Sequence, residues 1–215
     1  RRQRQMCIRD RFSKKPWKAF EKGWKGGVNE VKMWGGLFAT GSYMNHQSHR
    51  NFWTASWELI SRFTWQLPQT MIGHGYAQFS GYAGQVDNVD YWGGATVMSG
   101  NNWGQKAVTL SSFIIGDRTI SADPNNSVFQ HEYGHYLQSQ SMGWGYLSRI
   151  GIPSLMSADG SGEHKYQPHE QDANARAFLY FNRHVSGFYQ TEAQYDTNIE
   201  RGNSIGWNFK ANPLD

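Results

Sequence analysis

The pentapeptide HEYGH at residues 131–135 constrains this chain more than any other feature. It fits the pattern H-E-x-x-H, which on an α-helix places the two histidines one turn apart on the same face. Two neutral imidazoles so placed can hold a metal ion, and the glutamate between them can take a proton from water activated there. The chance of a random match in this chain is on the order of 1%. The alternative is a solvated helix face with two ordinary histidines.

Signals around the pentapeptide predict the helix that it requires. Asp123 is predicted to cap the helix and Pro124 to be its first residue. Residues 125–140 then show apolar side chains at helical spacing. Gly143 and Gly145 are predicted to end the helix.

Gly134 lies inside this predicted helix, where a glycine costs about 1 kcal/mol relative to alanine. One interpretation is that another segment, or a substrate, passes close to the helix beside the metal. The other is tight packing alone, and the sequence favours neither.

A second helix is predicted to supply a third ligand, beginning at Pro168. Glu170 precedes Asn174 by one turn, and an asparagine there can hydrogen-bond a metal-bound histidine. Asp172 instead precedes Arg176, whose charge would repel a dication, so this pair is predicted to be an exposed ion pair. Glu170 is therefore the expected third ligand.

HEYGH followed by ExxAN on a second helix resembles the gluzincin group of zinc peptidases, and the ExxAN form is similar to ImmA/IrrE-type peptidases. Over residues 50–215 the chain also resembles zincin-like domains at the C-termini of Rhs-repeat-associated proteins of Bacteroidetes. The segments that carry this second likeness are VFQHEYGHYLQSQSMGWGYLSRIGIPSLMSA, EQDANARAFLYF, RNFWTASWELISRFTWQLPQT and GGATVMSGNNW.

The resemblance implies an α+β, zincin-like fold with a small β-sheet packed on the active-site helix and further helices. It implies a zinc peptidase in which His131, His135 and Glu170 bind the metal and Glu132 is the general base. Asn174 would orient a histidine from behind. The chain shows no clear counterpart of the tyrosine or histidine that stabilises the oxyanion in thermolysin-like enzymes.

Two other functions are compatible with the same residues. One is a toxin module of a polymorphic, Rhs-type system that uses this chemistry and is neutralised by a cognate immunity protein. The other is a non-catalytic binding domain stabilised by zinc. The presence of Glu132 argues against the latter, because a purely structural site needs no base.

Residues 1–11, RRQRQMCIRDR, resemble translated sequencing adapter and are interpreted as a non-native scar. Without their five arginines and one aspartate, the 21 Lys+Arg and 17 Asp+Glu become 16 of each. The basic character then vanishes, and a nucleic-acid partner is not expected. Cys7, the only cysteine, lies in the same stretch, so no disulfide or cysteine metal site is expected.

Residues 12–215 are expected to form one domain, a C-terminal fragment of a larger protein that is exported from a bacterium. No run of about 18 apolar residues predicts a membrane span. The expected partner is a peptide or protein substrate.

Helices are predicted over Ser48–Trp65, with a broad apolar face, and over Gln69–Phe79, with Pro68 between them. Strand signals cover 86–98 and 107–120, separated by a turn cluster at 99–102. The edge of this small sheet is expected to border the active-site cleft and to accept a substrate segment as an added strand. The alternative is an ordinary hairpin that covers the core.

The chain has 10 tryptophans. They are interpreted mainly as an aromatic core, in preference to carbohydrate stacking or membrane contact.

The loop Ser157–Gln167 is the expected lid, because it is rich in glycine and serine and joins the two ligand helices. Its His164 and Tyr166 are candidates to stabilise the oxyanion. His164 and His169 are weaker candidates for the third ligand. His46 and His49 are interpreted as part of a solvated linker.

Overall fold

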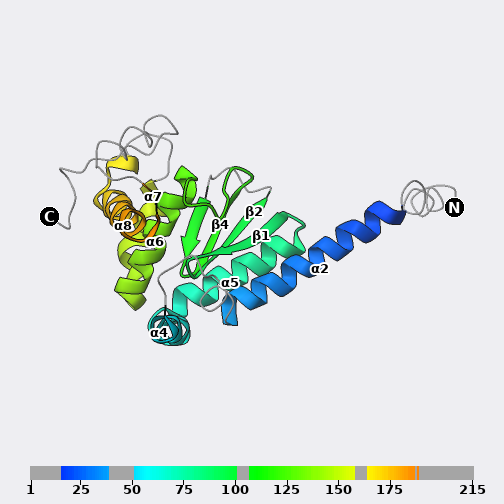
Figure 1. The fold of residues 1–215 in the computed structure, drawn as a ribbon, viewed down its shortest axis with the longest axis horizontal. Helices are drawn as coiled ribbons and strands as arrows, with labels where there is room; N and C mark the ends of the chain where they lie inside the picture. The colour runs from blue at the N-terminus through cyan, green and yellow to red at the C-terminus, as the bar shows by residue number, and fades with distance from the viewer. Residues whose placement is uncertain (1–15, 39–50, 101–106, 158–163, 187, 189–215) are drawn as a thin grey trace.

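The computed structural model describes residues 16–38, 51–100, 107–157, 164–186 and 188, and it shows an α+β fold, as predicted. Figure 1 shows the arrangement. In chain order the elements are α2 (Pro16–Phe38), α4 (Phe52–Phe63), α5 (Leu67–Tyr82), β1 (Val86–Trp92), β2 (Ala95–Gly100), β3 (Ala107–Leu110), β4 (Phe113–Asp117), α6 (Ser127–Met142), a 3-10 turn (Gly143–Gly145), a π-helical turn (Leu147–Gly151), α7 (Ile152–Ser157), a 3-10 turn (His164–Tyr166) and α8 (Pro168–His184).

The four strands form one mixed sheet in the order β1-β2-β4-β3. β1 pairs antiparallel with β2, β2 pairs parallel with β4, and β3 pairs antiparallel with β4. Each predicted strand run is thus two strands, because Gly93 and Gly94 at positive φ and Ser111 at φ 56° allow tight reversals. The predicted turn at 99–102 is wrong in its first half, since Ser99 and Gly100 belong to β2.

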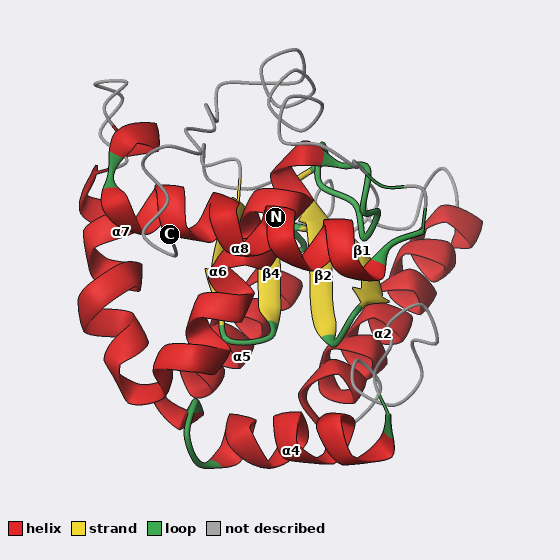
Figure 2. Cartoon of the chain, turned by 60° about the vertical axis from the view of Figure 1, so that its left-hand side comes forward, coloured by secondary structure: helices red, strands yellow, loops and turns green. Residues whose placement is uncertain are grey.

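Helices cover both faces of the sheet. Val97 and Ile114 face α6 and α8, whereas the neighbouring Met98 and Ile115 face α2 and α5. This alternation follows from the two-residue period of a strand. In Figure 2, α8 crosses in front of β2 and β4. The predicted small sheet packed on the HEYGH helix is therefore present, and α6 adjoins its edge strand β3.

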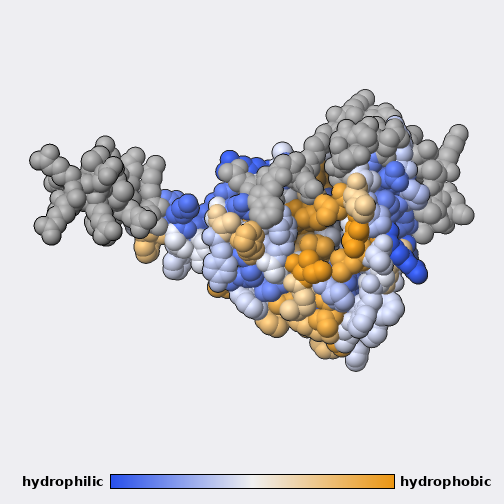
Figure 3. Space-filling model, turned by 180° about the vertical axis from the view of Figure 1, so that it is seen from behind, coloured by the Kyte–Doolittle hydropathy of each residue, from blue (hydrophilic) through white to orange (hydrophobic). Residues whose placement is uncertain are grey.

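The interpretation of the tryptophans as an aromatic core is wrong for most of those described. Trp92 is buried at 2% exposure, but Trp53 on α4 is 77% exposed. The apolar face predicted for α4 points outward, since Phe52 and Ile60 are exposed as well. Figure 3 shows that apolar side chains also gather on one side of the molecule. The seven exposed or largely exposed tryptophans are Trp17, Trp24, Trp34, Trp53, Trp57, Trp65 and Trp144.

The buried face of α4 carries an ion pair instead. Arg62 is fully buried and its Nη2 lies 2.7 Å from Oε1 of Glu58. It also donates to the carbonyls of Gly36, at 2.6 Å, and Gly94, at 2.8 Å. Tyr136 of α6 donates to the same carboxylate oxygen. The pair thus ties α4 to α2, to the β1–β2 turn and to the HEYGH helix.

One helix begins earlier than predicted, and another was not predicted. The helix predicted over Gln69–Phe79 begins at Leu67, so Pro68 lies in its first turn rather than ending the preceding helix. The helix α2 was not predicted. Among the described helices, none has the length and apolar character needed to cross a membrane.

Candidate metal centre

The helix α6 carries the HEYGH sequence and begins later than predicted. The side chain of Asn126 caps it by accepting a hydrogen bond from the third helical amide at 2.9 Å. Asp123 does not cap the helix, because its carboxylate accepts the backbone amide of Asn125 within the preceding turn. The helix ends before Gly143, which adopts φ 52°, as the glycine signal predicted.

The helix α8 begins at Pro168, as predicted, and crosses α6 at Gly134. A Cβ atom on Gly134 would lie 2.0 Å from the backbone oxygen of Ala173. The segment that passes close to this glycine is therefore α8 itself. This contact sets how near the second helix comes to the two histidines.

The two helices bring His131, His135 and Glu170 together as a buried group whose ligand atoms all lie within 4.8 Å of one another. Oε2 of Glu170 is 3.0 Å from Nε2 of His131 and 3.1 Å from Nε2 of His135. Ligands at about 2.0–2.2 Å around a tetrahedral ion are about 3.3 Å apart. Together the three side chains fit a single metal ion.

The Nδ1 atom of each imidazole, which is the nitrogen that does not face Glu170, contacts the amide oxygen of another side chain. Nδ1 of His131 lies 2.9 Å from Oδ1 of Asn174, in the position expected from the ExxAN resemblance. Nδ1 of His135 lies 2.7 Å from Oε1 of Gln138, a residue that the sequence analysis did not single out. Its position three residues after His135 on the same helix could have indicated this contact, because side chains with that spacing are neighbours on a helix surface.

The electrostatics of the group stabilise a positive charge on His135. Burial lowers the pKa of His135, but the charge of Glu170, its hydrogen bond, the charge of Glu132 and the contact with Gln138 together raise it to about 9. Burial raises the pKa of Glu170, yet the charge of His135 and the hydrogen bonds of the surrounding histidines hold it well below its usual range. The group therefore favours a bound positive charge.

Glu132 is buried beside this group without belonging to it. The Thr109 hydroxyl on β3 lies 2.6 Å from Oε2 of Glu132 and 3.0 Å from its backbone oxygen. Tyr146 donates its hydroxyl to the Thr109 carbonyl at 3.0 Å. Burial, with the charges of Glu132 and Glu170, raises the pKa of Tyr146 well above its usual value, so this phenol stays neutral. Neither Thr109 nor Tyr146 was anticipated from the sequence.

Of the three other candidate residues, His164 and His169 lie near Glu170. Nε2 of His164 is 3.5 Å and Nε2 of His169 is 3.3 Å from Oε1 of Glu170, the oxygen turned away from the other two histidines. Neither joins the group that can hold a metal. Nδ1 of His164 is held by Ser157 at 2.7 Å. Tyr166 is 57% exposed.

Asp172 was predicted to form an exposed ion pair with Arg176. The predicted pair is confirmed, but the predicted exposure of Asp172 is wrong. The pair exists at 2.7 Å, but Asp172 is buried. The reason is that Asp172 faces α6, where it also accepts a hydrogen bond from Gln138 at 2.7 Å.

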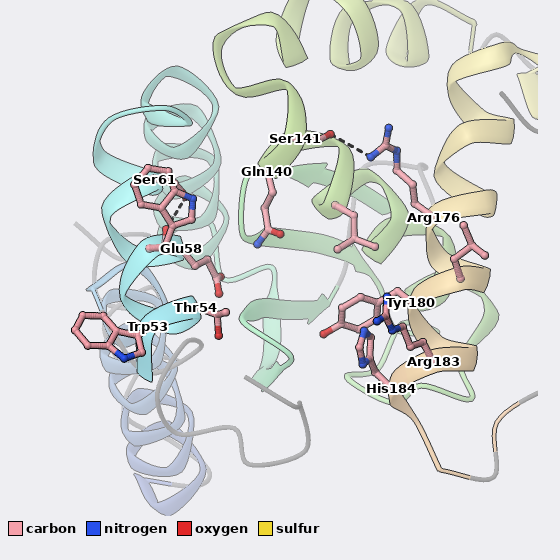
Figure 4. A pocket seen from close by; sticks show the side chains of 13 residues that line it. Trp53, Thr54, Glu58, Ser61, Gln140, Ser141, Arg176, Tyr180, Arg183 and His184 are labelled. Atoms are coloured by element: carbon pink, nitrogen blue, oxygen red, sulfur yellow. Dashed lines mark hydrogen bonds between the residues drawn. The ribbon is translucent and has the colours of Figure 1, made fainter. Parts of the chain in front are cut away.

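A separate pocket of about 770 Å³ lies between α4, α6 and α8, away from the metal group. In Figure 4, Glu58 and Thr54 of α4 face Tyr180, Arg183 and His184 of α8 across it. None of the three candidate metal ligands lines this pocket.

Several sequence-based predictions lie outside the described residues, namely those for residues 1–11, for His46 and His49, and for 158–163 of the lid loop. No protein-family model, curated protein or solved structure matches this chain.

Proposed function

We propose that this protein is a zinc-dependent peptidase with a zincin-like fold. The observation that carries the proposal is that the candidate metal ligands and the candidate base are different residues that lie side by side. Three buried ligand atoms converge, and the Glu132 carboxylate lies beside them without joining them. Structural zinc sites normally use four protein ligands, whereas catalytic sites use three and keep one position open. Among the residues that the structure describes the group has three ligands, which favours catalysis over a purely structural role.

The donor set favours zinc among the common cations. Two imidazole nitrogens and one carboxylate oxygen suit zinc, whereas calcium and magnesium prefer oxygen ligands alone. Asn174 and Gln138 support the imidazoles through their outer nitrogens, which is the usual arrangement around metal-binding histidines.

When bound, zinc would polarise the scissile carbonyl and lower the pKa of the attacking water toward ~7. Glu132 would then accept the proton of that water and return it to the leaving amine. Thr109 holds one oxygen of this carboxylate, so the other remains for proton transfer. His164, with Nε2 near Glu170 and only 35% of its side chain exposed, is the better placed of the two proposed oxyanion donors.

A peptide is the substrate class that the neighbouring strand favours. Within the described residues β3 is an edge of the sheet, and its Thr109 touches Glu132. An extended peptide that pairs with this edge would bring its main chain past the metal group.

Elemental analysis of purified protein, together with an assay on a casein-like substrate, tests the proposal. We expect one zinc per chain and hydrolysis that a chelator abolishes. Glu132→Gln should keep the zinc and lose about three orders of magnitude in kcat, because only the base is removed. His135→Ala should lose the metal as well. A Glu132→Gln variant as active as the parent, or a zinc-loaded parent that cleaves nothing, would contradict the proposal.

A further inference from the structure

Gln138 lies fully buried behind His135 and uses both ends of its amide. Its Oε1 is 2.7 Å from Nδ1 of His135. Its Nε2 is 2.7 Å from Oδ2 of Asp172 and 2.7 Å from the backbone oxygen of His169. All three contacts join α6 to α8 or to the metal group.

The partners of this amide decide which way it faces. The backbone oxygen of His169 can only accept hydrogen bonds, and so can the carboxylate of Asp172, which is ion-paired with Arg176. The amide nitrogen has two hydrogens, one for each of these acceptors. Arg176 is itself anchored by the Ser141 hydroxyl at 3.2 Å (Figure 4). The amide oxygen must therefore face His135.

An acceptor at Nδ1 decides where the hydrogen of the neutral imidazole resides. Because Oε1 of Gln138 can only accept, His135 must donate from Nδ1. Its Nε2, 3.1 Å from Glu170, is then the nitrogen with the lone pair. This is the tautomer that a metal ion requires at that position.

We propose that Gln138 is a positioning residue that fixes the metal-binding tautomer of His135, with its own orientation set by Asp172 and the His169 carbonyl. The inference rests on the proposed zinc site, and it assigns Asp172 and Arg176 a role in metal binding without contact to the metal. Asn174 does the equivalent for His131 with a single contact, whereas the Gln138 arrangement couples His135 to both ligand helices.

The same helix offers a matched control. Gln130 is also buried, and its Nε2 donates to the Pro124 carbonyl at 2.6 Å, at the far end of the helix from Gln138. Gln130→Met and Gln138→Met each remove a buried amide from α6 and replace it with an unbranched apolar side chain. Only the second change removes the acceptor from His135.

The test measures zinc affinity by competition with a chelator at fixed pH, alongside the melting temperature of the metal-free protein. Gln138→Met should weaken zinc binding about 10–100-fold, as for other residues that orient metal ligands, while Gln130→Met should leave it within about twofold of the parent. Equal zinc affinity of Gln138→Met and the parent would overturn the inference.

The variant Gln138→Glu distinguishes an effect on the His135 tautomer from an effect on folding. It also provides the test if Gln138→Met does not fold. It keeps an acceptor for His135 but places a carboxylate against Asp172. Its melting temperature should fall while its zinc affinity stays at or above that of the parent. Weaker zinc binding by Gln138→Glu would overturn the inference. Because zinc binding is measured directly, a parent that binds zinc but cleaves no peptide would contradict the peptidase proposal alone.

Discussion

The Thr109 hydroxyl lies 2.6 Å from Oε2 of Glu132 and connects the edge strand β3 to the residue between the two metal-site histidines. Thr109 is buried, and its own carbonyl is held by Tyr146. The strand proposed to receive the substrate and the proposed general base are thereby fixed relative to each other. A shift of β3 would also move the carboxylate.

Thr109→Val tests this connection, because valine keeps the shape of threonine but cannot donate. A hydrogen bond to a charged group contributes about 1.5–3 kcal/mol, so we expect kcat to fall at least about tenfold. KM and zinc content should stay unchanged. Thr109→Ser keeps the hydroxyl and should retain most of the activity. If steady-state kinetics show Thr109→Val to be as active as the parent, the hydroxyl does not position the Glu132 carboxylate for catalysis.

The metal-free protein should lose stability as pH rises through about 9. The pKa of His135 is raised from 6.5 to about 9 in the folded state, so its contribution is complete below pH 6.5 and disappears above about 9. A shift of this size corresponds to up to about 3 kcal/mol. The pKa of Glu170 is lowered from 4.5, so its contribution is complete above pH 4.5 and declines at lower pH.

Thermal unfolding of chelator-treated protein should therefore show the highest contribution of this pair between pH 4.5 and 6.5. The melting temperature at pH 6 should exceed that at pH 10, and His135→Gln should reduce the difference. Zinc affinity should change in the opposite direction, rising with pH until His135 has lost its Nε2 proton. A parent whose metal-free stability is equal at both pH values would contradict the assignment.

The members of the metal group could be predicted from sequence because the spacings within each of the two helices are local. The two histidines are one helical turn apart, and Glu170 is one turn from the asparagine that supports His131. Thr109 could not be predicted, because its contact depends on how β3 packs against α6. The burial of Asp172 was missed for the same reason, since the i,i+4 spacing with Arg176 says nothing about which side faces α6.

The helix α2 could not be predicted because its local preferences oppose it. Its sequence PWKAFEKGWKGGVNEVKMWGGLF contains five glycines, and each costs about 1 kcal/mol in a helix relative to alanine. Tertiary contacts stabilise it instead. Met33 and Leu37 are buried against the sheet, and Lys32 donates to the Val89 carbonyl at 2.7 Å.

The buried face of α4 could not be predicted from its hydrophobic pattern either. Its aromatic stripe suggested a buried face, yet the opposite face with Arg62 is buried, because this guanidinium pairs with Glu58 and donates to the backbone oxygens of three other residues. Hydrophobic spacing identifies a face of a helix without identifying what it packs against. A polar face can become the buried one when its charges are paired and most of its polar groups are hydrogen-bonded.

Arg62→Met should destabilise the protein by about 3–5 kcal/mol, since it leaves the buried Glu58 carboxylate without its cation. Arg118→Met is the matched control. Arg118 pairs with Asp87 at 2.6 Å, but their side chains are 66% and 46% exposed. Loss of an exposed pair should cost less than about 1 kcal/mol. Chemical denaturation of both variants measures the contrast, and equal effects would show that the burial of Arg62 carries no special weight.

Gly134→Ala gives a prediction whose sign depends on the packing of α6 against α8. Helix propensity alone would make this substitution stabilising by about 1 kcal/mol. The new Cβ would lie 2.0 Å from the Ala173 oxygen, which belongs to backbone and cannot move aside alone. We therefore expect destabilisation, together with weaker zinc binding, because α8 must move away and take Glu170 with it.

The control is Gly75→Ala in α5, where nothing lies within 4 Å of the added atom. This variant should be neutral or stabilising. Denaturation and zinc titration of the two variants test the argument, and a stabilised Gly134→Ala with unchanged zinc affinity would contradict the close approach of the two ligand helices.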